Sequence, residues 1–178
     1  MNGETIKKAI LDCGASGVGS FTGDTPTDRA FRDACAVNSC GKYGKCWTCP
    51  PDIGDIDTLT ATLKSYRNVI VYQLISPLED SFDFEGMVAA KKDFFALTKR
   101  VGKALSSLSA EKYLHLGAGG CGVCAKCAKE ENLPCRHPSQ AISSLEAYGV
   151  NVSLLAKKAG LNYINGPDTV TYFGAIFY

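Results

Sequence analysis

The sequence predicts a single α+β domain over residues 1–178, with helices packed on a small mixed sheet that carries two cysteine-rich metal loops. Residues 69–75 form a short, β-branched and mostly apolar run, which is typical of a central strand. Apolar residues recur at helical spacing over 85–108, which predicts a long amphipathic helix. Eight of the nine cysteines gather at 35–49 and 121–135. These features together predict a folded core that holds metal in two loops.

The N-terminal part of the chain predicts short elements that lead into an irregular segment. Apolar spacing indicates a helix over 6–13, and an extended segment is expected over 18–22. A further helix is expected over 26–34, because a proline suits its first turn and Thr25 can cap it. Glycines, prolines and four cysteines make 35–51 irregular.

The middle of the chain alternates helices and strands. A helix over 56–66 has Asp55 placed to cap it, and the strand at 69–75 follows. The long helix at 85–108 then leads to a strand at 113–116. Strand, helix and strand in this order predict a βαβ unit, provided that the two strands pair side by side.

The C-terminal part is expected to hold two helices and a hairpin. The helices span 138–149 and 151–160, with Asn151 placed to cap the second, and each ends at a glycine suited to left-handed backbone. Two strands, 161–164 and 170–178, flank the turn-forming residues 165–168. These residues therefore predict a C-terminal β-hairpin.

Charge and hydropathy exclude several classes of function. The formal net charge is +1, so no overall attraction to nucleic acid or to an anionic membrane is expected. No apolar run approaches the roughly 20 residues of a membrane helix. Charged residues interrupt the first twelve residues, unlike a secretory signal. We expect a cytoplasmic protein in a reducing, oxygen-poor interior, because an odd number of cysteines argues against a disulfide framework.

The more regular of the two cysteine motifs is C-x2-C-x2-C-x7-C, formed by Cys121, Cys124, Cys127 and Cys135. Closely spaced thiolates can each reach a different iron of one cubane, and a fourth cysteine closes the site. Zinc sites more often pair two separate C-x2-C knuckles. The spacing therefore favours a 4Fe–4S cluster over structural zinc or over inert cysteines.

Glycines just before and within this motif support the same interpretation. Residues 117–122 match G-x-G-x-x-G, but neither a following helix nor a suitably placed acidic residue completes a dinucleotide-binding fingerprint. Lacking a Cβ, Gly119, Gly120 and Gly122 let backbone N–H groups approach cluster sulfurs. We predict these three glycines as cofactor-binding residues.

A second constellation contains Cys35, Cys40, Cys46 and Cys49 within fifteen residues, followed by two prolines. All four thiols can close a second cluster or a zinc site. Alternatively, Cys35, Cys40 and Cys49 hold a cluster that leaves one iron open to a substrate as a Lewis acid. The spacing leaves both possibilities open.

Six short motifs around these cysteines resemble those of one known family: Arg32-Asp33-Ala34-Cys35, Cys40-Gly41-Lys42-Tyr43-Gly44, Trp47-Thr48-Cys49-Pro50-Pro51, Gly117-Ala118-Gly119-Gly120-Cys121, Cys135-Arg136-His137-Pro138 and Ser144-Leu145-Glu146-Ala147-Tyr148-Gly149. The family is the prokaryotic, largely anaerobic group of predicted metal-binding proteins known as domain-of-unknown-function family 2284. The resemblance covers nearly the whole chain and implies seven cysteine ligands, all those of the two motifs except Cys46. The family does not reliably carry cysteine at the position of Cys46, which keeps the open-iron alternative standing.

Three functions follow from these patterns. The first is a cytoplasmic iron–sulfur protein that passes single electrons to a redox protein partner. Five basic residues flank the ligands and either dock an acidic partner or balance the charge of the clusters: Lys42, Lys45, Lys126, Lys129 and Arg136.

The second function is an enzyme that uses the open iron on a small substrate. No Ser/His/Asp or Cys/His catalytic set is recognisable, and His115 and His137 are the two histidines. The third is a structural zinc protein. The sequence sets neither the substrate nor the oligomeric state.

Overall fold

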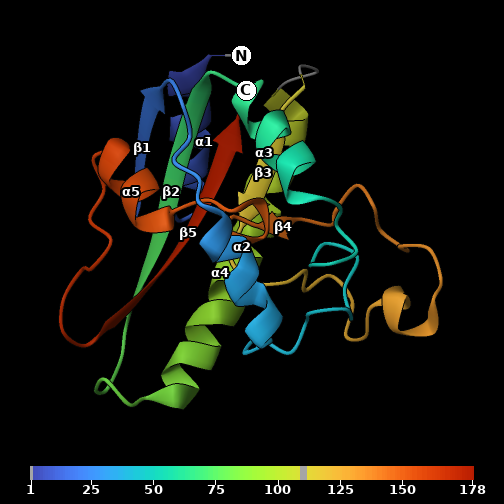
Figure 1. Ribbon diagram of the computed structural model, residues 1–178. Helices are drawn as coiled ribbons and strands as arrows, with labels where there is room; N and C mark the ends of the chain where they lie inside the picture. The colour runs from blue at the N-terminus through green and yellow to red at the C-terminus, as the bar shows by residue number, and fades with distance from the viewer. Residues whose placement is uncertain (1, 109–111) are drawn as a thin grey trace.

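The computed structural model describes residues 2–108 and 112–178, which build one five-stranded mixed sheet with helices on both faces (Figure 1). The strands lie in the order β1 (Gly17–Thr22), β2 (Asn68–Pro77), β5 (Thr169–Phe177), β3 (Leu114–Gly117) and β4 (Ser143–Ser144). All neighbours are antiparallel except β3 and β4, which are parallel. The predicted α+β class with a mixed sheet is confirmed.

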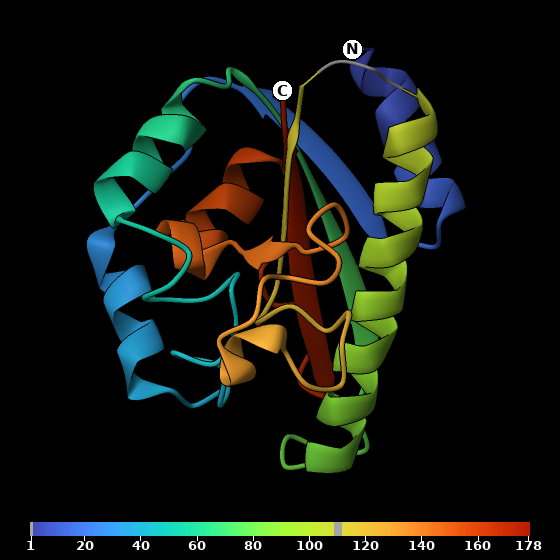
Figure 2. The same ribbon diagram turned by 90° about the vertical axis from the view of Figure 1, so that its right-hand side faces the viewer.

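The helices form two layers around the sheet, as Figure 2 shows. One face carries α1 (Gly3–Asp12) and α4 (Phe84–Leu108). The other side carries α2 (Arg29–Asp33), α3 (Ile56–Lys64) and α5 (Val152–Lys158). No helix in the described ranges is both long and apolar enough to cross a membrane.

Burial of alternating faces of β2 and β5 divides the core in two. Ile70, Tyr72 and Ile176 pack with the apolar stripe of α4, whereas Val71 and Phe177 pack on the other side with residues of α3 and α5. Each fully buried side chain of this kind stabilises the fold by about 1.5–3 kcal/mol. Side chains that alternate across two strands therefore hold both helical layers.

Two predicted helix caps are confirmed and one is wrong. The Asp55 carboxylate accepts hydrogen bonds from the first turn of α3, and the Asn151 side chain does the same for α5. At α2 the cap is Asp28 and not Thr25. The reason is that Thr27 bridges to Val150, which keeps the chain extended until Asp28.

The expected βαβ pairing and the C-terminal hairpin need correction. β5 lies between β2 and β3, so these two parallel strands are not neighbours. Residues 161–164 form no strand. Tyr163 stacks on Phe173 with ring centroids 5.6 Å apart, and Asn165 donates to Thr171. These contacts fasten the segment by its side chains, without strand pairing to β5.

The helix predicted over 138–149 is also wrong. The chain there turns, adds the short strand β4 beside β3, and then forms the 3-10 helix η3 (Glu146–Tyr148). The Leu145 N–H donates to the Gly117 carbonyl oxygen, so sheet pairing replaces the local helix. The glycine that follows, Gly149, does adopt the predicted left-handed backbone, with φ 70°.

Candidate metal centres

The two cysteine-rich segments lie side by side beyond the edge of the sheet that β3 and β4 form (Figures 1 and 2). We call residues 35–51 the first segment and residues 121–135 the second. All nine cysteines are unbridged. Cys46 and Cys49 are buried, Cys40 is exposed, and the other ligand candidates are partly buried. The fold therefore brings eight thiols from two distant parts of the chain to one end of the molecule.

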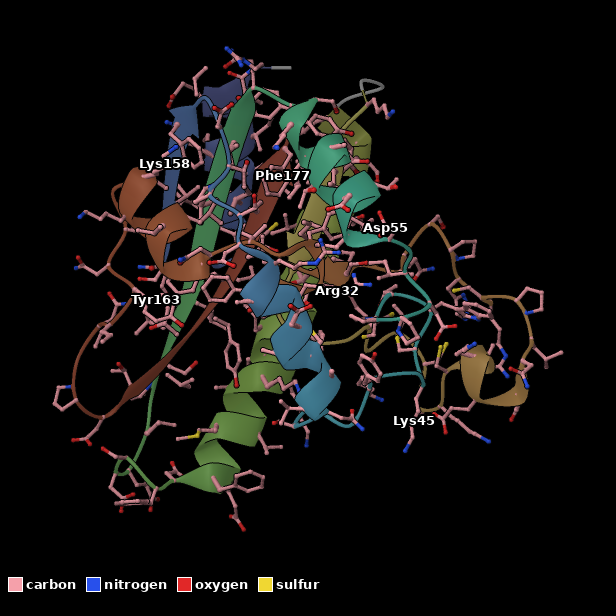
Figure 3. The ribbon with its side chains drawn as sticks, viewed as in Figure 1. Arg32, Lys45, Asp55, Lys158, Tyr163 and Phe177 are labelled. Carbon is pink, nitrogen blue, oxygen red and sulfur yellow. The ribbon has the colours of Figure 1, made fainter. Side chains whose placement is uncertain are left out.

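Arg32 holds the first segment at its beginning (Figure 3). Its guanidinium donates to the carbonyl oxygens of Ala147 and Gly54, both at 2.7 Å. These bonds join α2 to the loop before α3 and to η3. The 3-10 helix η1 (Ala34–Val37) continues α2 and carries Cys35. Arg32 thus fixes where this thiol stands.

Thr48 is the point where the two segments meet. Its Oγ1 accepts a hydrogen bond from the Cys121 N–H at 3.3 Å and lies 3.3 Å from Cys46 Sγ. Because the oxygen already accepts from Cys121, its own proton is free to be donated to the sulfur of Cys46. We call Cys46, Thr48, Cys49 and Cys121 the thiol junction.

Hydrogen bonds in the thiol junction separate the acidities of its two buried thiols. The bond with Cys49, helped by Thr48 and by the Cys121 N–H, lowers the pKa of Cys46 to about 5. The same hydrogen bond between the two side chains, together with burial, raises the pKa of Cys49. Of these two neighbouring thiols, Cys46 is therefore the more acidic and Cys49 the one that keeps its proton.

The three glycines predicted to bind a cofactor have different surroundings. A Cβ on Gly120 would stand 3.1 Å from Cys49 Sγ and 2.9 Å from Lys42 Cγ, so only glycine fits there without a shift. Gly119 has φ 70° and lies against the Lys91 side chain. A Cβ on Gly122 would meet the ring of Phe95 first, at 3.4 Å. Close approach of backbone to a cysteine sulfur is thus found at Gly120.

Ion pairs hold the second segment together. The Glu131 carboxylate lies 3.2 Å from both Lys126 Nζ and Arg136 Nη2, and Arg136 also donates to the Lys126 carbonyl oxygen. These contacts close the loop that carries Cys127 and the 3-10 helix η2 (Ala128–Glu131). Much of each paired side chain is exposed, so the solvent weakens the pairs.

A second set of contacts clamps the two segments to each other. Lys129 Nζ lies 2.6 Å from the Asp52 carboxylate, and their side chains are only 19% and 16% exposed. The same ammonium lies 4.6 Å from the centre of the Trp47 ring. The indole N–H of Trp47 donates to the Leu133 carbonyl oxygen at 2.9 Å. Trp47 therefore fastens the first segment to the second.

An open cavity of about 440 Å³ borders the first segment. Cys35, Cys40 and Cys49 line it together with Gly119 and Gly120, whereas Cys46 does not. The three thiols of the open-iron alternative therefore share one cavity, and the fourth turns to the thiol junction.

Sequence reasoning missed several residues of this cavity. Lys91 comes from α4, Tyr172 from β5, and Tyr163 from the loop before β5. Glu146 also lines it, and burial raises the pKa of its carboxyl group. These residues lie far apart in the sequence and share no spacing, so no local signal could have joined them to the cysteines. The motif at 144–149 contains Glu146 but assigns it no role.

Neither histidine extends the cysteine sets in this structure. His115 is partly buried, with Nε2 2.8 Å from the Tyr72 hydroxyl, and burial lowers its pKa to about 3. His137 is exposed.

The donor set can be tested against the metals that it was predicted to bind. Across 2–108 and 112–178, no group of three or more Cys, His, Asp or Glu side chains is arranged to hold one metal ion. In a four-iron cubane each thiolate binds a different iron, whereas zinc draws its ligands around one ion. Eight thiols in two segments, with backbone close to Cys49 Sγ at Gly120, fit the cluster's need for thiolates and nearby N–H donors.

The comparison with protein families agrees with a metal-binding role. Residues 22–178 match the model of the family DUF2284, described as predicted metal-binding protein. No curated protein matches the chain. A solved structure of epoxyqueuosine reductase from Bacillus subtilis is similar at 12% identity and a TM-score of 0.38. The similarity covers 97% of this chain but 44% of that one, so the chain spans less than half the length of the reductase.

Proposed function

Because this chain belongs to the DUF2284 family of predicted metal-binding proteins, we propose that it is an iron–sulfur redox protein with a 4Fe–4S centre at each cysteine-rich segment. A bound cluster would supply one-electron oxidation and reduction. The residues proposed to hold the two centres are Cys121, Cys124, Cys127 and Cys135 in the second segment, and Cys35, Cys40 and Cys49 in the first.

The thiol junction is the observation that supports this proposal most directly. Thr48 Oγ1 lies 3.3 Å from Cys46 Sγ and from the Cys121 nitrogen, so hydrogen bonds join Cys121, a proposed ligand of the second centre, to the residue next to Cys49, a proposed ligand of the first. Two isolated structural zinc sites would not need this connection. Two centres that exchange electrons would use it, because their ligands are then neighbours.

The electron partner is proposed to be another redox protein, with an acidic surface. Of the basic residues flanking the ligands, Lys126, Lys129 and Arg136 are already paired with carboxylates. Lys45 is exposed and points outward from the first segment (Figure 3). We therefore propose that Lys45 contributes to docking, which predicts weaker electron exchange with an acidic ferredoxin in Lys45→Glu.

The proposal is tested by purifying the protein without oxygen and measuring iron, acid-labile sulfide, zinc and visible absorbance. A 4Fe–4S protein is brown and its absorbance bleaches on reduction. A colourless protein that carries zinc and no sulfide would contradict the proposal and support the structural zinc alternative.

The cavity favours a second candidate function, an iron–sulfur enzyme that acts on a small molecule. Cys35, Cys40 and Cys49 line the cavity, and Cys46 hydrogen-bonds elsewhere. A cluster held by these three thiols would leave one iron facing the open space. Cyanide, a small iron ligand, should then change the electron paramagnetic resonance spectrum of the reduced protein. A spectrum unchanged by saturating cyanide would count against an open iron.

A further inference from the structure

The cavity beside the first segment has aromatic walls. Five aromatic side chains line it, namely Phe31, Tyr43, Tyr163, Tyr172 and Phe173. They come from α2, from the first cysteine-rich segment, from the loop before β5 and from β5 itself. Aromatic side chains present large apolar surfaces and prefer stacked or edge-on contacts with other rings. This lining suits a small, flat and largely apolar molecule.

Several of these rings are already held in place. Tyr163 stacks on Phe173 with an angle of 11° between their planes. Tyr172 lies against Phe94, with ring centroids 5.6 Å apart, and its hydroxyl donates to the Met87 carbonyl oxygen at 3.2 Å. A wall of fixed rings loses little side-chain freedom when a ligand binds.

Lys91 supplies the positive charge of the cavity. Apart from the thiols, Lys91 is the basic and Glu146 the acidic side chain among its lining residues. The Lys91 side chain lies along Gly119, where a Cβ would stand 3.6 Å from its Nζ. In the part of the chain that the structure describes, no carboxylate lies within ion-pair distance of this ammonium. Lys129, Lys126 and Arg136, by contrast, are all paired.

We propose that this cavity binds a small aromatic carboxylate, whose carboxylate pairs with Lys91 and whose ring packs against the aromatic wall. The inference deepens the proposed function and rests on it in one respect. A cluster held by Cys35, Cys40 and Cys49 would have an open iron, and this iron would face the bound molecule. Binding itself requires only the walls and Lys91, so it can be tested separately.

Benzoate is the probe, and benzyl alcohol is its neutral counterpart. Both are titrated into the anaerobically purified wild-type protein and into Lys91→Met and Lys92→Met, with binding followed by ligand-observed nuclear magnetic resonance. Lys92 is exposed on the same helix, which makes it the matched control. We expect saturable benzoate binding at millimolar concentrations, at least tenfold weaker in Lys91→Met and unchanged in Lys92→Met.

Comparison with benzyl alcohol separates the contribution of the ligand's charge to binding from that of its ring contacts. The affinity for benzyl alcohol should change less than twofold in Lys91→Met, and Tyr163→Leu should weaken both probes severalfold, because the stacked wall is lost. Circular dichroism of each variant establishes that it is folded. Benzoate binding that is absent in the wild type, or equal in wild type and Lys91→Met, would overturn the inference.

Iron and sulfide analysis of the same samples distinguishes a failure of the cavity inference from a failure of the proposed function. Benzoate binding that depends on Lys91 in a protein without iron would leave the cavity inference standing and remove the proposed function. An iron–sulfur protein whose benzoate affinity is the same with and without Lys91 would leave the proposed function standing and remove the cavity inference.

Discussion

Segment 35–51 places two thiols in the interior, whereas segment 121–135 leaves its thiols only partly covered. Cys46 and Cys49 are 1% and 6% exposed. Arg32, with bonds to the backbone before α3 and in η3, fixes the start of the first segment. Glu131 and its two exposed cationic partners close the second.

This difference indicates which segment shapes a binding site. Buried contacts and hydrogen bonds to backbone hold their geometry, whereas exposed ion pairs are screened by salt and contribute little. The first segment can therefore form the wall of a cavity with a fixed shape. The second is suited to hold a centre whose function needs no such wall.

The largest effect is expected from filling the space at Gly120. Gly120→Val would push a side chain into Cys49 Sγ and Lys42, which costs about 1–3 kcal/mol of unfolding free energy. The centre at the first segment should be lost, and the iron per chain should fall by about half if each segment holds one cubane. Thermal denaturation and iron analysis measure the two effects.

Gly102→Ala is the control for this substitution, because a Cβ there meets only the Nδ1 atom of His115 at 3.8 Å. It should keep the full iron content. If Gly120→Val binds as much iron as the wild type, the close approach of the Gly120 backbone to Cys49 Sγ does not matter for the first centre.

The next largest effect is expected from breaking an ion pair of the second segment, and two such pairs can be compared. Lys129→Met leaves the sheltered Asp52 carboxylate unpaired and should cost about 2 kcal/mol of unfolding free energy. Lys126→Met removes an exposed pair and should cost less than about 1 kcal/mol. Urea denaturation of both variants gives the values. Equal losses would mean that the clamp to the first segment is no stronger than a surface pair.

The smallest effect is expected at Thr48, where the segments meet. Thr48→Val keeps the shape of the side chain but removes the oxygen that contacts Cys46 and Cys121, which should cost about 1 kcal/mol. Thr48→Ser keeps the hydroxyl and should denature close to the wild type. If valine and serine variants are equally stable, the hydrogen bonds of the thiol junction contribute nothing.

Elements with strong local patterns were predictable from the sequence, and long-range pairings were not. The stripe that includes Phe94 and Leu97 defined α4, and Asp55 marked the start of α3. The place of β5 between β2 and β3 depends on pairs such as Val69 with Phe177, far apart in the chain. Local periodicity carries no information on such pairs.

The candidate site was likewise predictable in its local patterns and not in its long-range contacts. Spacing alone grouped the eight cysteines into the two segments that the structure places side by side. The contact of Thr48 with Cys121, and the meeting of Lys91 with Cys35, Cys40 and Cys49 in one cavity, arise from the packing of distant elements. Ligand candidates therefore followed from the sequence, and their surroundings did not.

The most direct test of the account is the iron and acid-labile sulfide content per chain in the wild type, Cys46→Ser and Cys124→Ser, all purified without oxygen. The account predicts iron with matching sulfide in the wild type and nearly full content in Cys46→Ser. It predicts loss of about half in Cys124→Ser, because that variant lacks one of four ligands of its cubane. Zinc without sulfide in the wild type, or equal iron losses in the two variants, would contradict it.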